Sequence, residues 1–229
     1  MGRTWVATAV ALLIVAACGS DDQRADRELS GATKEPLPVV DESELPDALA
    51  DDEPTSLRPP EGGLLLVYFG YTHCPDICPT TLLTLERALE RLPEDDRDRV
   101  AVAMVSVDPE RDSSEIFANH VEHFLADAPL RHAFRTDDQV LLDRVADSFG
   151  VTAVKEPYGD GPDEYEIGHS AQVFAVDDQG RIVVEWTFGT ESGPIADDIL
   201  TLLARIDGGA DTEQAGPNRP SQRRVSSQI

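Results

Sequence analysis

The stretch Tyr68-Phe69-Gly70-Tyr71-Thr72-His73-Cys74-Pro75-Asp76-Ile77-Cys78-Pro79 places two thiols four residues apart in the chain. An unbroken apolar run over residues 63–69 leads into it, which is typical of a strand covered on both faces. Pro79 suits the first turn of a helix, because its missing N–H costs nothing there. The two thiols are therefore expected where a buried strand gives way to a helix.

Strand and helix patterns alternate after this point. Apolar spacing predicts helices that start near residues 79, 113, 138 and 194, and strands over 99–107, 171–176 and 181–186. The segment 177–180 contains Asp, Gln and Gly and predicts a hairpin turn between the last two strands. A βαβα series closed by a hairpin and a helix is the order of an α/β protein with a thioredoxin-like fold. We expect a mixed central sheet with helices on both faces.

The first residues predict export. Arg3 precedes an apolar stretch that is too short to span a membrane and suits a signal peptide over residues 1–17. Small residues stand directly before Cys18, as in a bacterial lipobox, which predicts cleavage before Cys18 and its lipidation. An ordinary signal peptide or a short uncleaved anchor is the alternative. The expected location is the extracytoplasmic face of the bacterial cell membrane, with the chain held by a lipid anchor.

Composition divides the rest of the chain. Residues 18–60 are rich in acidic residues and proline, and they predict a flexible tether. Residues 61–207 have the size of one folded domain, and residues 208–229 predict a disordered tail. The formal net charge of the chain is −25, and such a surface repels nucleic acid and anionic lipid headgroups. A nucleic-acid partner is therefore not expected.

Cys74 and Cys78 are the only cysteines beyond Cys18. In an exported protein, such a pair can form a structural disulfide, act as a redox dithiol or bind a metal. A disulfide closing so short a loop would stabilise the fold little. A helix N-terminus lowers thiol pKa values, and the thiolate both attacks disulfides and binds soft metals. Three residues between the cysteines favour a coordination site, and two thiolates with an imidazole would suit copper.

Five histidines compete for the imidazole role. His73 is expected at the rim of the site, His120 and His123 on a solvated helix face, and His132 in an exposed basic patch. His169 is different, since it directly precedes a predicted core strand. In a thioredoxin-like fold the loop entering that strand faces the cysteine loop, so His169 can reach both sulfurs.

Three segments carry a family resemblance. The stretch 68–82, the stretch Val105-Ser106-Val107-Asp108-Pro109-Glu110-Arg111-Asp112 and the triplet Gly168-His169-Ser170 resemble the signatures of the Sco/SenC family. The resemblance implies a membrane-tethered copper protein that binds one copper ion, Cu(I) or Cu(II), through Cys74, Cys78 and His169. It also implies assembly of the copper A centre in cytochrome c oxidase subunit II as the function, with another copper chaperone as the donor.

Two other functions use the same residues. In a thiol-disulfide oxidoreductase that keeps the target cysteines reduced, Cys74 and Cys78 would be the catalytic redox pair. A copper or redox sensor would differ only in its partner. We expect a metallochaperone rather than an enzyme. A peroxidase is not expected, because the second cysteine and Pro79 occupy the space that a peroxidatic site needs.

Two further expectations concern the surroundings of the site. Family members commonly enter the first core strand through a hairpin, and residues 37–60 offer a proline- and acid-rich substitute, so this hairpin is expected to be shortened or absent. Asp108 stands before Pro109 and is expected to end a strand and shape a turn. The acidic residues Asp163, Glu164 and Glu166 are expected in a solvated loop; the alternative is that they orient the ring of His169.

Overall fold

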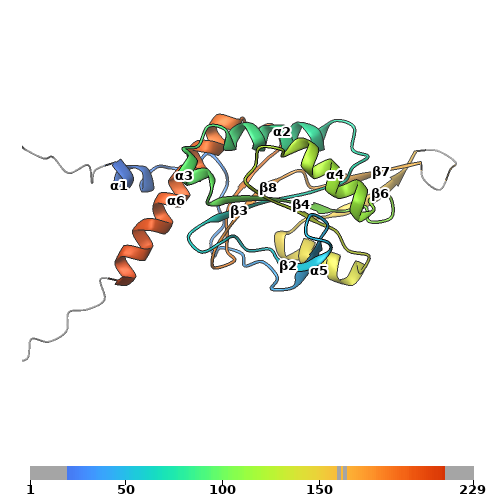
Figure 1. Cartoon of the computed structure of the whole chain (residues 1–229), viewed down its shortest axis with the longest axis horizontal. Coiled ribbons are helices and arrows are strands. Elements are labelled where there is room, and N and C mark those ends of the chain that lie inside the picture. The colour runs from blue at the N-terminus through green and yellow to red at the C-terminus, as the bar shows by residue number, and fades with distance from the viewer. Residues whose placement is uncertain (1–19, 159–160, 162–163, 215–229) are drawn as a thin grey trace, which may run out of the picture.

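A seven-stranded mixed sheet forms the centre of the computed structural model, which describes residues 20–158, 161 and 164–214 (Figure 1). The strands follow the order β2-β1-β5-β4-β3-β8-β9, and their bounds are β1 Glu44–Asp47, β2 Glu53–Ser56, β3 Leu64–Gly70, β4 Val100–Ser106, β5 Leu130–Phe134, β8 Val173–Asp177 and β9 Ile182–Trp186. Strands β3, β4 and β5 run parallel, whereas β8 pairs antiparallel with both β3 and β9. A separate two-stranded ribbon joins β6 (Ala153–Pro157) to β7 (Tyr165–His169).

The two central strands are buried along their whole length. Every residue of β3 and β4 is buried, as the continuous apolar runs predicted. Alternation along β3 sends Tyr68 toward the cysteine side, where its hydroxyl meets Cys78, and Phe69 to the opposite side, where it packs against Phe149. The core therefore extends over both faces of the sheet.

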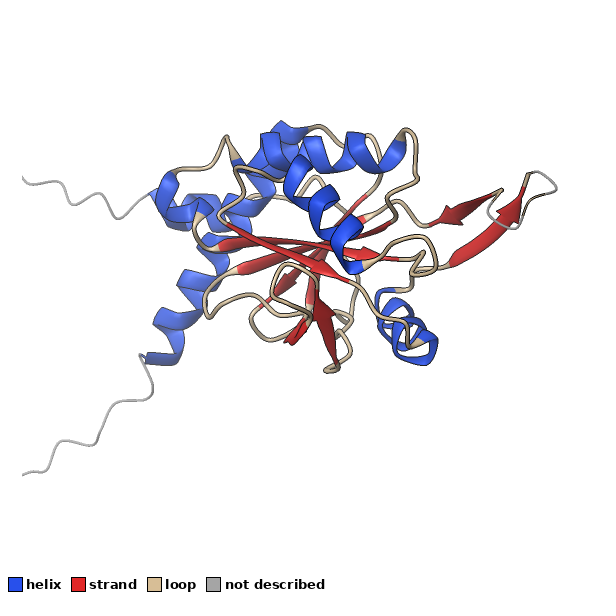
Figure 2. Cartoon of the chain, turned by 45° about the vertical axis from the view of Figure 1, so that its right-hand side comes forward, coloured by secondary structure: helices blue, strands red, loops and turns tan. Residues whose placement is uncertain are grey.

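Helices cover both of these faces, which confirms the predicted thioredoxin-like α/β fold (Figures 1 and 2). On one face α2 contacts both α4 and α6, and α5 lies on the other. The helix bounds are α1 Ser20–Ala25, α2 Ile77–Leu89, α3 Glu94–Arg97, α4 Ser114–Phe124, α5 Gln139–Phe149 and α6 Ser192–Gln214.

Helix ends follow ordinary capping chemistry. The hydroxyl of Ser113 accepts a hydrogen bond from the backbone N–H of Ile116 at the start of α4. Asp138 caps α5 through its carboxylate, and Gly150 ends that helix with a φ of 70°. Helix α2 begins at Ile77, two residues before the predicted start at Pro79, so Cys78 lies inside its first turn.

The flexible tether predicted for residues 18–60 is wrong for most of that segment. Strands β1 and β2 pair in register from Glu44 opposite Ser56, so the hairpin expected to be shortened or absent is formed. Leu45 and Leu57 are buried in the core, and backbone bridges join Ala32 to Glu185 in β9. A few apolar anchors and backbone hydrogen bonds outweigh the acidic, proline-rich composition.

The predicted boundary at residue 208 is also wrong in part. Helix α6 continues through Gly208 and ends at Gln214, so the domain helix extends into the expected tail. Residues 1–19, with the predicted signal peptide and Cys18, and residues 215–229 lie outside the described part. Among the helices of the described residues, none combines the length and apolar character that a membrane crossing requires.

One carboxylate pins the N-terminal segment to the domain. Asp198 of α6 is buried and accepts hydrogen bonds from the backbone N–H groups of Ser30 and Gly31 and from the indole N–H of Trp186. The Ser30 hydroxyl donates to the same carboxylate at 2.7 Å. Removing Asp198 would take the acceptor from all four donors, and the loss is most costly for the indole N–H of Trp186, which is buried.

We therefore expect Asp198→Ala to lower the free energy of unfolding by roughly 2–4 kcal/mol. It should also speed tryptic cleavage within residues 24–34. The matched control is Asp197→Ala, since Asp197 is exposed and forms only a 3.8 Å ion pair with Arg27. Urea unfolding measures the free energy, and timed proteolysis measures the cleavage rate. Equal stability and equal cleavage of the two variants would contradict the conclusion that Asp198 holds the N-terminal segment.

Candidate metal centre

Cys74, Cys78 and His169 come together in the structure, as the sequence predicted. One ligand atom from each side chain lies within 4.8 Å of the others, and the described residues contain no further group of three or more Cys, His, Asp or Glu side chains arranged in this way. Both cysteines are free thiols. The Cys78 Sγ lies 3.8 Å from Nε2 of His169, although the two residues are 91 positions apart in the chain.

The two thiols occupy the junction between β3 and α2. Cys74 lies in the loop and Cys78 in the first turn of the helix. The backbone N–H of Cys78 donates a hydrogen bond to the Cys74 sulfur at 3.3 Å. A helix N-terminus offers such unpaired N–H groups to an anionic partner, so the local backbone stabilises a thiolate at Cys74.

His169 reaches the thiols from the ribbon. The sequence predicted that His169 lies in a loop directly before the core strand. Instead, it is the last residue of β7, and three residues separate it from β8. Its Nδ1 lies 2.9 Å from the carbonyl oxygen of Ser170. A carbonyl can only accept, so Nδ1 carries the proton and the Nε2 lone pair faces the sulfurs. The backbone of Ser170, rather than Glu164 or Glu166, orients the ring; Asp163 lies outside the described residues.

Two tyrosines border the imidazole. The rings of Tyr68 and Tyr71 contact the His169 ring edge to face, with centroid distances of 6.0 and 5.8 Å. The Tyr68 hydroxyl also donates a hydrogen bond to the Cys78 sulfur at 3.3 Å. Sequence reasoning did not single out either tyrosine. The signal for Tyr68 was the alternation of β3, which places it on the same face of the sheet as α2.

The thiols hold their protons unequally. A hydrogen bond from the Cys78 side chain lowers the pKa of Cys74, while the same pairing and burial raise the pKa of Cys78. The pair therefore keeps one proton on Cys78 and forms a thiolate at Cys74, which is the more accessible sulfur. A thiolate next to a thiol can attack a disulfide, or it can bind a soft cation once the second proton leaves.

The other four histidines do not join the thiols. His73 is exposed, and His123 is exposed, as expected for the solvated face of α4. The same expectation is wrong for His120, which is half-buried, and its burial lowers its pKa. The expectation that His132 is exposed is wrong: its Nδ1 lies 2.7 Å from the buried carboxylate of Asp47, and its ring stacks on Phe134. This pairing depends on the β1–β5 contact, which the sequence did not predict.

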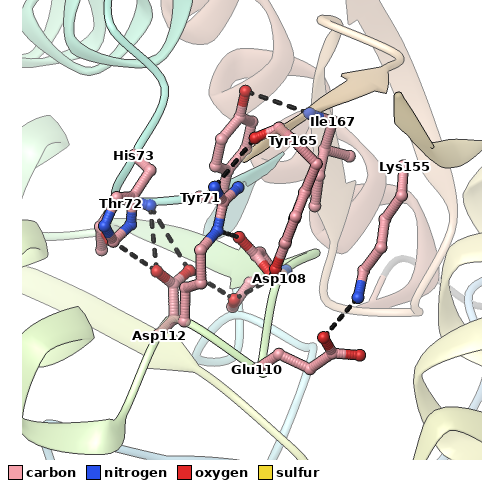
Figure 3. Close-up of polar contacts among 11 residues, drawn as sticks. Tyr71, Thr72, His73, Asp108, Glu110, Asp112, Lys155, Tyr165 and Ile167 are labelled. Atoms are coloured by element: carbon pink, nitrogen blue, oxygen red, sulfur yellow. Dashed lines mark hydrogen bonds and ion pairs between the residues drawn. The ribbon is translucent and has the colours of Figure 1, made fainter. Parts of the chain in front are cut away.

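A buried carboxylate holds the cysteine loop in place. Asp112 is fully buried and accepts hydrogen bonds from the hydroxyls of Thr72 and Ser106 (Figure 3). The backbone N–H of Thr72 points to the same carboxylate at 3.2 Å. The loop that carries Cys74 is thereby fixed to the end of β4, and Asp112 is a site residue whose role the sequence did not reveal.

The donor set fits a copper ion. Two sulfurs and one imidazole nitrogen form a soft set of ligands, and such sets favour Cu(I) and Zn(II) over hard cations. A structural zinc site would require a fourth protein ligand, and the described residues supply three. Cys74, Cys78 and His169 are therefore the residues that would hold copper.

Thiol alkylation tests the unequal protonation. Because the pKa of Cys74 is lowered, its thiolate persists at pH values where an ordinary thiol, with a pKa of about 8.5, is protonated. We expect iodoacetamide to modify Cys74 at a rate that stays nearly constant between about pH 6 and about pH 8. Peptide mass spectrometry of the reduced, metal-free chain measures this rate of Cys74 modification.

Two variants of Cys78 control this experiment. Cys78→Ala removes the hydrogen-bond donor, so the reaction of Cys74 should shift to higher pH. Cys78→Ser keeps a hydroxyl donor and should shift it less. Identical pH profiles for all three chains would show that Cys78 does not set the protonation of Cys74.

Comparison with known proteins agrees with this site. The SCO1/SenC family model matches residues 45–204. The structure of Bradyrhizobium japonicum ScoI with copper bound is 30% identical and covers 70% of this chain and 97% of its own, with a TM-score of 0.59. Apo Sco1 from Thermus thermophilus is 31% identical and covers 80% of this chain and 98% of its own, also with a TM-score of 0.59.

Two relatives known from sequence are similar over shorter spans. The SCO2-like protein RP587 of Rickettsia prowazekii is 32% identical over 120 residues, which are 52% of this chain and 56% of the relative. The human mitochondrial SCO1 homolog is 31% identical over 146 residues, which are 62% of this chain and 46% of the relative. The chain thus spans about half the length of these relatives. Its fold, its Cys-Cys-His cluster and the match over residues 45–204 show that it belongs to the SCO1/SenC family.

Proposed function

We propose that this chain is a copper-binding metallochaperone, anchored by a lipid on Cys18 at the extracytoplasmic face of the bacterial membrane. Its function would be to assist assembly of the copper A centre of cytochrome c oxidase subunit II. The observation that carries the proposal is the cluster of Cys74, Cys78 and His169, whose ligand atoms lie within 4.8 Å of one another. Copper is the cargo in this proposal, with one ion per chain.

The similar proteins support copper as the ligand. The Bradyrhizobium ScoI structure, at 30% identity, contains bound copper. Membership of the SCO1/SenC family supports the assembly function, together with subunit II as the recipient and a second copper chaperone as the donor. The short apolar stretch before Cys18 supports export and lipid anchoring.

Partial exposure of the site suits transfer. Cys78 is fully buried, whereas 8% of Cys74 is exposed and His169 is half-buried. Cys74 and His169 therefore face the side from which a partner can approach. Binding of the copper cargo would release the proton held by Cys78. Copper would then be delivered by stepwise exchange of Cys74, Cys78 and His169 for the cysteines of the partner.

A thiol-disulfide oxidoreductase is the second candidate, and the lowered pKa of Cys74 favours it. The Cys74 thiolate would attack a disulfide of the partner, forming a mixed disulfide and releasing one partner thiolate. The Cys78 sulfur, after losing its proton, would then attack Cys74 and release the second partner thiolate. The partner gains two electrons, and the Cys74–Cys78 pair becomes a disulfide.

Replacement of His169 separates the two functions. We expect the reduced full chain in detergent to bind one Cu(I), and His169→Ala to weaken binding at least about tenfold, because the site loses its only imidazole. With Cu(II), the thiolate charge-transfer absorption should be lost in the same variant. Disulfide reduction needs only the thiols and should be largely unchanged. Anaerobic competition with a chromogenic chelator measures the affinity.

His123→Ala is the matched control, since His123 is exposed on α4 and lies outside the site. It should bind copper as the unmodified chain does. If the unmodified chain retains no copper while its dithiol still reduces disulfides, the metallochaperone proposal is wrong and the oxidoreductase is the better description.

A further inference from the structure

The ribbon that carries His169 stands apart from the main sheet. Strands β6 and β7 pair only with each other, and the ribbon projects from the body of the domain (Figures 1 and 2). All five residues of β6 are exposed. Since no main-sheet ladder fixes the ribbon, side-chain contacts must set the position of His169 relative to the thiols.

One face of β7 supplies these contacts. Tyr165, Ile167 and His169 alternate along the strand and share its inner face, where Tyr165 and Ile167 are buried. The backbone N–H of Ile167 donates a hydrogen bond to the Tyr71 hydroxyl at 3.3 Å. Tyr71 in turn borders the His169 ring. The inner face of β7 is thus held against the cysteine loop.

Tyr165 attaches the ribbon to the end of β4. Its hydroxyl donates a hydrogen bond of 2.7 Å to the carboxylate of Asp108, which is completely buried (Figure 3). Hydrogen bonds to a buried charged acceptor are among the stronger ones in proteins. Asp108 therefore does more than end a strand, which was its expected role, because it ties two segments together across 57 residues of chain.

Arg111 completes the attachment. Its Nε donates to Asp108, and its Nη1 donates to the backbone carbonyl of Tyr165 at 2.9 Å. The guanidinium carbon lies 3.7 Å from the centre of the Tyr165 ring and 5.7 Å from that of Tyr71. A planar guanidinium can combine forked hydrogen bonds with stacking in this way, which an ammonium group cannot do.

We infer that Asp108, Arg111 and Tyr165 form a latch, and that this latch positions His169 for metal binding by holding β7 against the thiol loop. The inference rests on the proposed function, because it assigns positioning residues to the same site. Lys155 of β6 pairs with Glu110, and its Nζ lies 4.7 Å from the centre of the Tyr165 ring. The side chains of Lys155 and Glu110 are 45% and 70% exposed, so solvent screens this ion pair. The buried contacts, not this pair, set the geometry.

Tyr165→Phe tests the latch, because it removes one hydroxyl and keeps the ring beneath Arg111. The matched control is Tyr158→Phe, a tyrosine of the same ribbon region whose side chain is 68% exposed. Without metal, amide hydrogen exchange of residues 165–169 in the full chain should accelerate about tenfold or more in Tyr165→Phe, as expected for loss of a hydrogen bond to a charged group. The control should leave it unchanged.

Copper affinity supplies the second measurement, made in two backgrounds. Tyr165→Phe should weaken Cu(I) binding about tenfold in the otherwise unmodified chain and should have no further effect in the His169→Ala background. Asp108→Asn should behave in the same way, since it keeps an acceptor but loses the charge that pairs with Arg111. Equal weakening in both backgrounds would show that Tyr165 acts on the fold rather than through His169, and would overturn the latch.

The two proposals fail separately. If no chain binds copper, the metallochaperone function is wrong, but amide exchange still decides whether the latch holds the ribbon. If copper binds normally and Tyr165→Phe changes neither exchange nor affinity, the latch is wrong and the proposed function stands.

Discussion

The site depends on holding an imidazole beside two sulfurs that come from a distant part of the chain. The Cys78 Sγ and His169 Nε2 lie 3.8 Å apart across 91 positions of sequence. The loop after β4 holds both the sulfur-bearing and the imidazole-bearing segments. Asp112 binds the cysteine loop through Thr72, and Asp108 binds the ribbon through Tyr165. Burying two carboxylates is costly, and it is tolerated here because each accepts at least two hydrogen bonds. Two of the buried carboxylates of the fold thus hold in place the two segments that form the site.

Local patterns predicted the centre of this protein well. The apolar runs of β3 and β4 are buried as expected, the hairpin at residues 177–180 joins β8 to β9, and the thiols lie at a helix start. His169 could be chosen because topology, rather than proximity in sequence, brings it to the thiols. These features follow from periodicity and strand order, which a single sequence displays.

The features that were missed depend on partners far away in the chain. The β1–β2 hairpin is anchored by Leu45 and Leu57, which are sparse among acidic residues and prolines, so composition pointed to a tether. His132 is half-buried because Asp47 of that same hairpin faces it. The ribbon was missed because β6 is exposed throughout and carries no strand-like apolar pattern. Long-range pairing of charged and aromatic groups leaves no periodic signal.

The hold of Asp198 on Ser30 also limits how far the domain can travel. If Cys18 is the lipidated residue, as proposed, only residues 19–29 separate the anchor from Ser30, the residue that Asp198 holds. An extended chain gains at most about 3.6 Å per residue, so this connecting segment spans no more than about 40 Å. Six of its residues form α1, which shortens it further, since a helix rises only about 1.5 Å per residue. The domain would therefore stay within roughly one protein diameter of the lipid surface. A partner would have to present its binding site at that distance from the membrane.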